Sequence, residues 1–217
     1  MVNSTMQQIC LACTDDGNSI AQLRIEEFNR SSDFKLLKPQ LLEWGKMDEQ
    51  HEVVVVWDKG HGPAATMRFV RVDDEYQASQ VIEADLPPGI AFPAVVFNAA
   101  ATRKSHRGRG INQLLRYHGI LAALEQGIQS LLSPVYQSAP RYGFLQELGY
   151  VCHEMTHTWQ TKLAPRSPRM LCVLDRADFL PALARLESSS RDLINQVPWT
   201  GPPLTLEAPV PEPAPTA

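Results

Sequence analysis

The sequence predicts an α/β fold, in which helices pack on a central sheet, and three observations support this. Two long apolar runs have the character of buried strands: 53–57 (VVVVW) is continuous and β-branched, and 94–102 is a second such run. Apolar residues return at helical spacing over 111–124 and again over 177–195. Strand and helix signals also alternate along the chain, which is typical of α/β proteins.

The composition limits the domain organisation. With 44% apolar and 20% charged residues among 217, the chain is neither disordered throughout, nor collagen-like, nor a disulfide miniprotein. Seven of its 17 prolines fall in the last twenty residues. We therefore expect one folded domain over 1–196 and a proline-rich, disordered tail over 197–217.

The first half of the chain should hold a strand, two helices and a hairpin. In order, the expected strand covers 8–13, the helices 19–29 and 39–47, and the hairpin strands 53–57 and 65–72, joined by a glycine-containing turn. The apolar side of the second hairpin strand switches near Val70, which suggests a bulge there.

The second half continues the alternation. After the buried strand 94–102 and a basic loop, the expected elements are a helix from 111 to 127, a strand over 128–136, a short helix over 140–148, strands over 150–161 and 170–174, and a final amphipathic helix over 177–195.

The net charge of −4 is unevenly distributed. No Asp or Glu occurs between Leu86 and Leu124, whereas five cationic residues do: Arg103, Lys104, Arg107, Arg109 and Arg116. A local cationic patch on an acidic protein favours a compact anionic ligand or an acidic partner, because a nucleic-acid-binding surface normally makes the whole domain basic. We therefore expect no binding to nucleic acid.

Neither secretion nor membrane insertion is predicted. The segment 1–5 has no cationic residue and no apolar run follows it, so no signal peptide is expected. The longest apolar stretch, 86–102, contains three prolines and is too short to span a bilayer. The four cysteines are too scattered for a disulfide framework, so we expect reduced thiols and a cytoplasmic location. The Cys10-x-x-Cys13 spacing would suit half a zinc site, a redox pair or simply a strand.

The segment 102–112 (TRKSHRGRGIN) carries the strongest functional signal. A buried strand runs into a loop with two glycines, and the loop opens directly into a helix. Glycines let the backbone approach an anion, the first helical amides lack intrahelical partners, and the helix dipole adds partial positive charge. Nearby arginines supply forked donors. This position between strand and helix predicts a pyrophosphate site rather than a solvated surface turn.

The loop resembles the phosphate-binding motif of the GNAT superfamily of N-acetyltransferases, Arg/Gln-x-x-Gly-x-Gly/Ala. The motif aligns with Arg107-Gly108-Arg109-Gly110-Ile111-Asn112, except that Asn112 stands where Gly or Ala is usual. A second family landmark, a short helix ending in a leucine-glycine-aromatic turn, matches 144–150 (FLQELGY). The resemblance covers roughly residues 8–175 and implies a GNAT-like mixed, splayed β-sheet flanked by helices.

This resemblance implies acetyl-CoA or another acyl-CoA as cofactor, and no metal. The pantetheine arm would lie in the splayed sheet and pair with strand amides near Ala100 and Thr102. An amine, on a small molecule or a peptide, would attack the acyl carbonyl, with proximity, a base and an acid as the only chemical requirements. The phosphates would be held by Arg107, Gly108, Arg109, Gly110, Ile111 and Asn112.

The sequence departs from the family at the catalytic positions. The tyrosine that often serves as the acid would fall at Leu145, and the acidic residue usual on the strand before the loop is missing. Tyr142 is the nearest substitute, unless it only closes the cleft. Glu83 and Asp85 precede the splayed strand and are candidate bases or solvated loop acids. Asn98, a polar residue in an apolar run, would bind either substrate or backbone.

The segment 153–157 (HEMTH) matches the HExxH pattern of zinc proteases. That chemistry needs a helix, because only helical spacing places both imidazoles on one face. Gly149 ends the preceding helix and the residues after it favour a strand, on which Glu154 would face away from both histidines. We therefore favour a strand over a zinc hydrolase, and His153 or His157 could instead face the amine as a base.

The sequence thus predicts an N-acyltransferase that moves an acyl group from coenzyme A to an amine. The segment 150–174 and the following helix also loosely resemble the N-acyl amino acid and autoinducer synthases, which take acyl groups from acyl carrier protein; the cationic patch would suit either donor. A degenerate protein that binds an acyl thioester without turnover is a third alternative, because the family's acid and base positions are empty.

Overall fold

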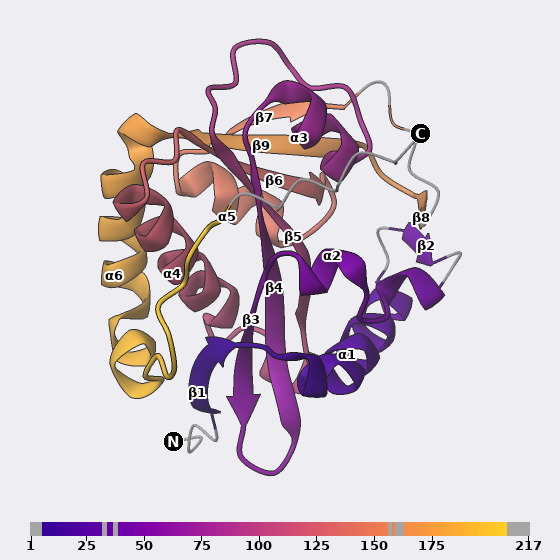
Figure 1. The fold of residues 1–217 in the computed structure, drawn as a ribbon, viewed down its shortest axis with the longest axis vertical. Helices are drawn as coiled ribbons and strands as arrows, with labels where there is room; N and C mark the ends of the chain where they lie inside the picture. The colour runs from indigo at the N-terminus through magenta and orange to yellow at the C-terminus, as the bar shows by residue number, and fades with distance from the viewer. Residues whose placement is uncertain (1–5, 32–33, 37–38, 156–157, 159–162, 208–217) are drawn as a thin grey trace, which may run out of the picture.

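The structure, a computed structural model, describes residues 6–31, 34–36, 39–155, 158 and 163–207. It confirms the predicted class, since helices flank a seven-stranded mixed sheet (Figure 1). The strand order of this sheet is β1-β3-β4-β5-β6-β9-β7, and β2 pairs with β8 in a separate two-stranded sheet. None of the described helices is both long and apolar enough to cross a membrane.

The first half of the chain follows the prediction closely except in three places, one of which is the unpredicted strand β2. Its elements are β1 (Met6–Leu11), α1 (Gly17–Asn29), β2 (Phe34–Leu36), α2 (Lys46–Glu49), β3 (Glu52–Asp58), β4 (Gly62–Val72) and α3 (Glu75–Ile82). The predicted helix 39–47 is instead a 3-10 turn, Pro39–Leu42, followed by the short α2. Helix α3 lies in a stretch with no helical prediction, where the side chain of Asp74 caps it by accepting from the amide of Gln77.

The bulge predicted near Val70 is wrong, because Val70 pairs regularly with Val96. The irregular positions lie between Val56 and Trp57, and in the β4–β5 pair between Thr66 and Arg68. The apolar residues change side along this strand in the sequence because β4 is buried on both of its faces.

The second half contains β5 (Ala94–Thr102), α4 (Ile111–Glu125), β6 (Ser130–Tyr136), α5 (Arg141–Glu147), β7 (Val151–Glu154), β8 (Leu163–Pro165), β9 (Arg169–Asp175) and α6 (Phe179–Gln196). The first half of the HExxH segment therefore lies in a strand, as expected, while His157 lies outside the described residues. Of the strand predicted beyond Glu154, the structure describes a single bridge between Thr158 and Ala84.

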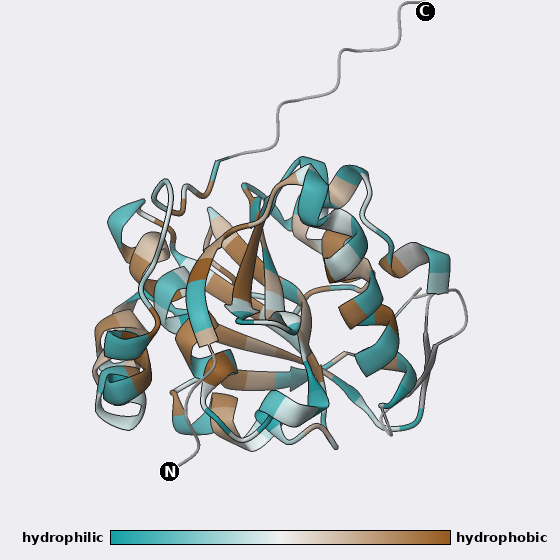
Figure 2. Ribbon diagram, turned by 90° about the horizontal axis from the view of Figure 1, so that it is seen from below, coloured by the Kyte–Doolittle hydropathy of each residue, from teal (hydrophilic) through white to brown (hydrophobic). Residues whose placement is uncertain are grey.

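Two layers of helices bury the sheet. Helices α4 and α6 pack together over one face, whereas α1 and α3 lie on the other (Figure 1). Under α4, Phe69 and Phe97 meet edge to face with their ring centroids 4.7 Å apart. Gly119 lets the helix approach these rings, since a Cβ there would lie 2.7 Å from Cζ of Phe97. Figure 2 shows the apolar strands enclosed by helices with polar outer faces.

The sheet opens between β5 and β6, as predicted. These parallel strands pair only from Ala94 with Ser130 to Val96 with Leu132, and then separate. In Figure 1, β6 and β9 run across the view while β4 and β5 run along it. The remainder of β5 therefore has an open edge on the β6 side, which is where a ligand can pair with strand amides.

Residues 197–207 pack on the domain, whereas the sequence placed them in a disordered tail. The amide of Ile9 donates to the carbonyl of Pro198 at 3.1 Å, and the amide of Leu206 donates to Oε1 of Gln126 at 2.6 Å. Val197, Leu204 and Leu206 are buried. Their apolar side chains occur too irregularly among the prolines to show a period, so the packing was not visible in the sequence. Residues 208–217 lie outside the described part.

Two of the four cysteines predicted to be reduced form a disulfide. Cys152 on β7 and Cys172 on β9 are directly opposite each other in the antiparallel pair, and their sulfur atoms are bonded. Cys10 and Cys13 are free. The prediction that all four cysteines are reduced was wrong because the pairing of β7 with β9 makes Cys152 and Cys172 neighbours although they are distant along the chain.

His118 on α4 should make the protein less stable in mild acid. Its ring stacks on Trp199, burial lowers its pKa from 6.5 to about 4, and its Nε2 has no partner among the described residues. Between these two pH values the unfolded chain binds a proton that the folded chain does not, so stability falls as the pH drops from 6.5 towards 4. We expect a loss of about 1–3 kcal/mol in the unfolding free energy over this range.

Urea unfolding at several pH values would measure this loss. His118→Phe keeps an aromatic ring against Trp199 and should flatten the pH dependence. If the stability of His118→Phe falls with pH as steeply as that of the original protein, His118 is not the cause of the loss in acid.

Candidate functional site

The loop between β5 and α4 exposes a row of backbone amides. Gly108 and Gly110 have φ of 73° and 77°, a conformation that side chains disfavour. The carbonyl of Gly110 accepts the first helical bond, from the amide of Leu114 at 3.0 Å. Over the described chain, no hydrogen-bond partner accepts from the amides of 108–113. Glycines thus turn the chain so that the amides at the start of α4 stay available to an anion.

The base of the loop is anchored to the hairpin. His106 is buried, and its Nε2 lies 2.8 Å from Oδ2 of Asp58 at the end of β3. The guanidinium of Arg103 donates to the carbonyl of Pro63 at the start of β4. Arg103 therefore has a structural role, and the loop has a fixed position relative to the sheet.

A cleft of about 540 Å³ lies in front of the loop. We call it the loop cleft; its wall is made by α1, the end of β5, the loop and the start of α5, including Phe28, Arg30, Ala100, Thr102, Gly110 and Phe144. The predicted residues Ala100, Thr102, Arg107, Gly108, Gly110, Ile111 and Asn112 all line this cleft. Seven of the residues predicted to bind the cofactor thus lie together around one cleft, and their binding role stays a prediction.

Glu27 on α1 forms ion pairs with two arginines that line the loop cleft, Arg30 and Arg107. Its side chain is only 2% exposed and binds two half-exposed arginines, Nη1 of Arg30 at 2.5 Å and Nη2 of Arg107 at 2.6 Å. It also accepts from the backbone amide of Lys104 at 3.1 Å. A buried carboxylate thus holds both guanidiniums beside the cleft and ties the loop to α1. The sequence analysis did not single out Glu27.

Three predicted phosphate residues have roles that the motif did not indicate. Ile111 is buried, so only its amide is available. The side chain of Asn112 accepts from Nε of Arg116 at 3.0 Å, which explains a polar residue where the family has Gly or Ala. Arg109 is exposed and lines a different hollow, beside Arg191 of α6.

The backbone of β5 is distorted at the open edge. Thr66 pairs with Ala101 and Arg68 with Asn98, so one extra residue is accommodated around Ala99, whose φ is +48°. A left-handed alanine in a strand is uncommon and marks a bulge that redirects the backbone. The amide of Arg103 bonds to β4, so by alternation that of Thr102 faces the open edge.

A second, smaller hollow of about 150 Å³ adjoins the loop cleft at Phe28, Ala100 and Arg141. We call it the arginine pocket, because five arginines and only two acids line it: Arg24, Arg68, Arg116, Arg141, Arg169, Asp48 and Glu83. Its charged lining thus carries a net charge of +3. A concave site with this excess of cations favours an anionic group.

Asp48 holds two of these arginines. Its Oδ1 accepts from Nη1 of Arg24 at 2.8 Å and from Nη1 of Arg68 at 3.3 Å. Nε of Arg68 also donates to Oδ1 of Asn98 at 3.0 Å, which gives that polar strand residue its role. Burial lowers the pKa of Arg68 to about 10, so it remains a cation at neutral pH. Nε and Nη2 of the buried Arg24 have no partner in the described residues.

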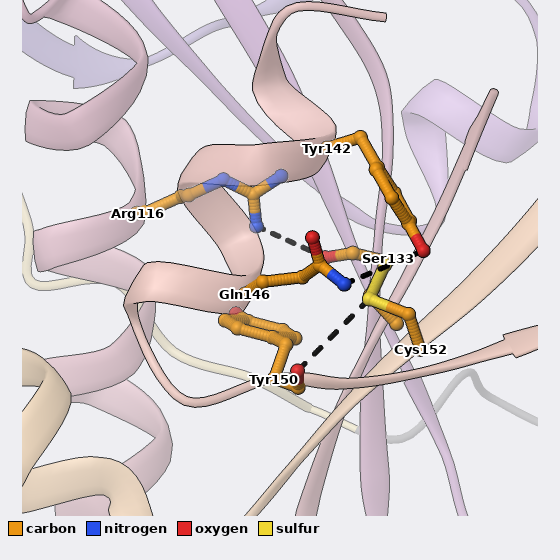
Figure 3. The surroundings of a disulfide bond; sticks show 7 residues. Arg116, Ser133, Tyr142, Gln146, Tyr150 and Cys152 are labelled. Atoms are coloured by element: carbon orange, nitrogen blue, oxygen red, sulfur yellow. Dashed lines mark hydrogen bonds between the residues drawn. A yellow bond between two sulfur atoms is a disulfide. The ribbon is translucent and has the colours of Figure 1, made fainter. Parts of the chain in front are cut away.

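Arg116 belongs to this pocket and not to a surface patch. It is only 2% exposed, and its guanidinium lies over the rings of Phe97 and Tyr150. Nη1 donates to Oγ of Ser133 at 2.9 Å (Figure 3). Burial lowers the pKa of Arg116. The predicted exposed cationic patch is therefore reduced to Lys104, Arg107 and Arg109.

The two predicted catalytic residues lie in different places. Glu83 lines the arginine pocket at the end of α3. Tyr142 lines neither hollow; its hydroxyl lies 3.5 Å from Nε2 of Gln146 and faces the Cys152 region (Figure 3). Leu145, where the family's tyrosine would fall, is a fully buried core residue. The position thus supports Glu83 as a site residue and leaves Tyr142 outside the hollows.

No family model matches the chain, and no curated protein has a similar sequence. Among solved structures, the N-acetyltransferase from Staphylococcus aureus Mu50 aligns with a TM-score of 0.55 at 16% identity, over 78% of this chain and 98% of that one. The chain has the GNAT fold. The predicted resemblance is thereby confirmed at the level of the fold.

Other structures with the GNAT fold align equally well. The CoA-dependent acyl-homoserine lactone synthase BjaI, solved with SAM and isopentyl-CoA, has a TM-score of 0.60 at 15% identity and covers 90% of this chain and 94% of its own. YncA from Salmonella typhimurium, a putative acetyltransferase solved with acetyl-CoA, has a TM-score of 0.51 at 14% identity over 80% and 95%. An autoinducer synthase is thus among the neighbours, as the sequence suggested.

Proposed function

We propose that this protein is an N-acyltransferase that transfers an acyl group from a coenzyme A thioester to an amine. The observation that carries the proposal is the loop cleft, where free amides at the start of α4 meet the open edge of β5. Glycines at 108 and 110 give a pyrophosphate close access to these amides, and Arg30 and Arg107 supply cations beside them. Structures solved with acyl-CoA or acetyl-CoA have the same fold.

In this proposal the two hollows receive the two substrates. The pantetheine arm would pair with the open edge of β5 near Ala100 and Thr102, which directs the thioester to the junction of the hollows at Ala100. An amide from the bulge at Ala99 would polarise the acyl carbonyl. The amine would then enter through the arginine pocket, which contains Glu83 as a base.

The lining of the arginine pocket supports an acceptor that carries a negative group besides its amine. A simple ammonium would be repelled by the net charge of +3, whereas a carboxylate would find the unpartnered nitrogens of Arg24 and Arg169. Nearby cations also lower the pKa of an ammonium, which releases the nucleophilic amine. BjaI, with the same fold, was solved with SAM, an amino acid derivative. We therefore favour an amino acid or a related compound.

A thiol-release assay with acetyl-CoA, a longer acyl-CoA and pairs of amino acids and amino acid amides tests this function. We expect each acid to have a kcat/KM at least tenfold above that of its amide, because only the acid offers a carboxylate. Arg169→Gln removes the buried Nη1 donor, which has no partner among the described residues, and should largely abolish the difference. Arg71→Gln, which loses a partly exposed ion pair with Asp73, is the control and should preserve it. Equal rates for acids and amides would contradict the anionic acceptor.

Acyl carrier protein is the second candidate donor, and one feature favours it. Lys104, Arg107 and Arg109 are exposed; Arg107 lines the loop cleft and Arg109 lines the neighbouring hollow that shares Gly108 and Gly110 with it, so an acidic carrier would dock over the loop. In the same assay, a carrier-dependent enzyme would release thiol from the acylated carrier but scarcely from acyl-CoA. Binding of coenzyme A without release from either donor would instead indicate a protein that binds thioesters without turnover.

A further inference from the structure

One tyrosine lies where the sheet opens between β5 and β6. These strands pair only from Ala94 with Ser130 to Val96 with Leu132, and Tyr136 ends β6 beyond that pairing. Tyr136 and Ala100 both line the arginine pocket. Ala100 is also the strand residue shared by the loop cleft and the arginine pocket. Tyr136 therefore lies in the pocket that adjoins the junction where the two hollows meet.

Tyr136 is held firmly in this position. It pairs with Arg169 at the end of a continuous β6–β9 ladder, and its carbonyl accepts from the amide of Ala139 at 2.9 Å. The residue is only 5% exposed, and it lines the arginine pocket. The phenol is thus part of the pocket wall and shielded from bulk solvent, unlike a loop residue that would need to move into place.

The charges around Tyr136 suit proton transfer. Arg169 interacts electrostatically with both Tyr136 and Glu83. Its Nη2 donates a hydrogen bond to the carbonyl of Ile82 at 2.6 Å, which fixes the guanidinium. Burial lowers the pKa of Arg169, while these two neighbours act in the opposite direction. A cation beside a phenol stabilises the phenolate that remains after the proton has left. One pocket thus contains a carboxylate and a phenol that both interact electrostatically with the same cation.

We propose that Tyr136 is the general acid that protonates the departing thiolate, a role that rests on the proposed acyl transfer. The substrate ammonium first loses one proton, which leaves to solvent, with Glu83 as acceptor. The amine nitrogen then forms the C–N bond, and as the C–S bond breaks Tyr136 gives its phenolic proton to sulfur. The second proton lost from nitrogen restores the phenol. The products are the amide, the free thiol and one released proton, so the step balances.

Tyr136→Phe tests this role, with Tyr142→Phe as the matched control. We expect Tyr136→Phe to lower kcat about 100- to 10,000-fold with KM within threefold, because the proton donor is lost. The rate of the original enzyme should also decline at alkaline pH as the phenol loses its proton, and the variant should lack this decline. Tyr142→Phe should leave kcat within twofold, since Tyr142 lines neither hollow.

Thermal stabilisation by coenzyme A checks that Tyr136→Phe is folded and that its donor site is intact. An unchanged kcat and pH profile in a variant that still binds coenzyme A would overturn the role of Tyr136. If the original protein binds coenzyme A but releases no thiol with any amine, the proposed function fails and the role of Tyr136 fails with it. The activity of the original protein distinguishes the two failures. If it releases thiol, only the role of Tyr136 is in question; if it does not, the proposed function itself fails.

Discussion

Replacing Gly110 with aspartate should weaken the binding of coenzyme A at least 100-fold. Gly110 lies directly before α4, and its φ of 77° strains any residue with a Cβ. The added Cβ itself has room, since it would make ordinary van der Waals contacts 3.4 Å from Oε1 of Gln113 and 3.5 Å from Cδ2 of Leu193. More important is the carboxylate, which would compete with a pyrophosphate for the free amides of the loop and repel it. Calorimetric titration with coenzyme A measures the loss.

Two control variants separate the effect of backbone strain from the effect of the added negative charge. Gly110→Ala introduces the strain without the charge and should lose less affinity than the aspartate. Gly127→Asp adds the same charge at another glycine with a φ of 73°, beyond the opposite end of α4, and should leave the affinity unchanged. If Gly110→Asp binds coenzyme A as tightly as Gly127→Asp, the loop is not the phosphate site.

The backbone of the loop between β5 and α4 could be predicted from sequence because its residues are contiguous. A buried strand, two glycines and a helix start within 102–112 determine both the local backbone and its chemistry. The opening between β5 and β6 was likewise expected, but only through the resemblance to a family. Helix α3 was missed because its sequence, 75–82, is mostly polar, and its stability depends on a cap at Asp74 and on burial of Ala78 and Ile82.

The arginine pocket could not be predicted in the same way, because α1, α2, β4, α4 and β9 each contribute to it. One signal was present in the sequence. Arg24 falls between Ile20 and Phe28 at helical spacing, so a charge occupies the apolar stripe of α1. Such a residue must be buried with a partner, but the identity of that partner, Asp48, depends on how α2 docks on α1. The cystine likewise depends on register between distant strands.

Asp48→Asn should be the most destabilising polar substitution in the arginine pocket. Its carboxylate is 5% exposed and accepts from both Arg24 and Arg68. Without it, two buried guanidiniums would lack a counter-charge, and such losses typically cost about 3–5 kcal/mol. For a domain of this size we expect the Tm to fall by about 10 °C. Asp73→Asn is the control: it breaks the ion pair with Arg71 at 40% side-chain exposure and should cost under about 1 kcal/mol.

The same variant links stability to the proposed acceptor site. Once Asp48 is neutral, the pocket has a larger excess of positive charge, and a small anion that enters it should recover part of the lost stability. Sulfate stabilises folded proteins generally, so the difference in Tm between sodium sulfate and sodium chloride at equal ionic strength should be positive in both variants but larger in Asp48→Asn than in Asp73→Asn. An equal difference in the two variants would show that this pocket does not select anions.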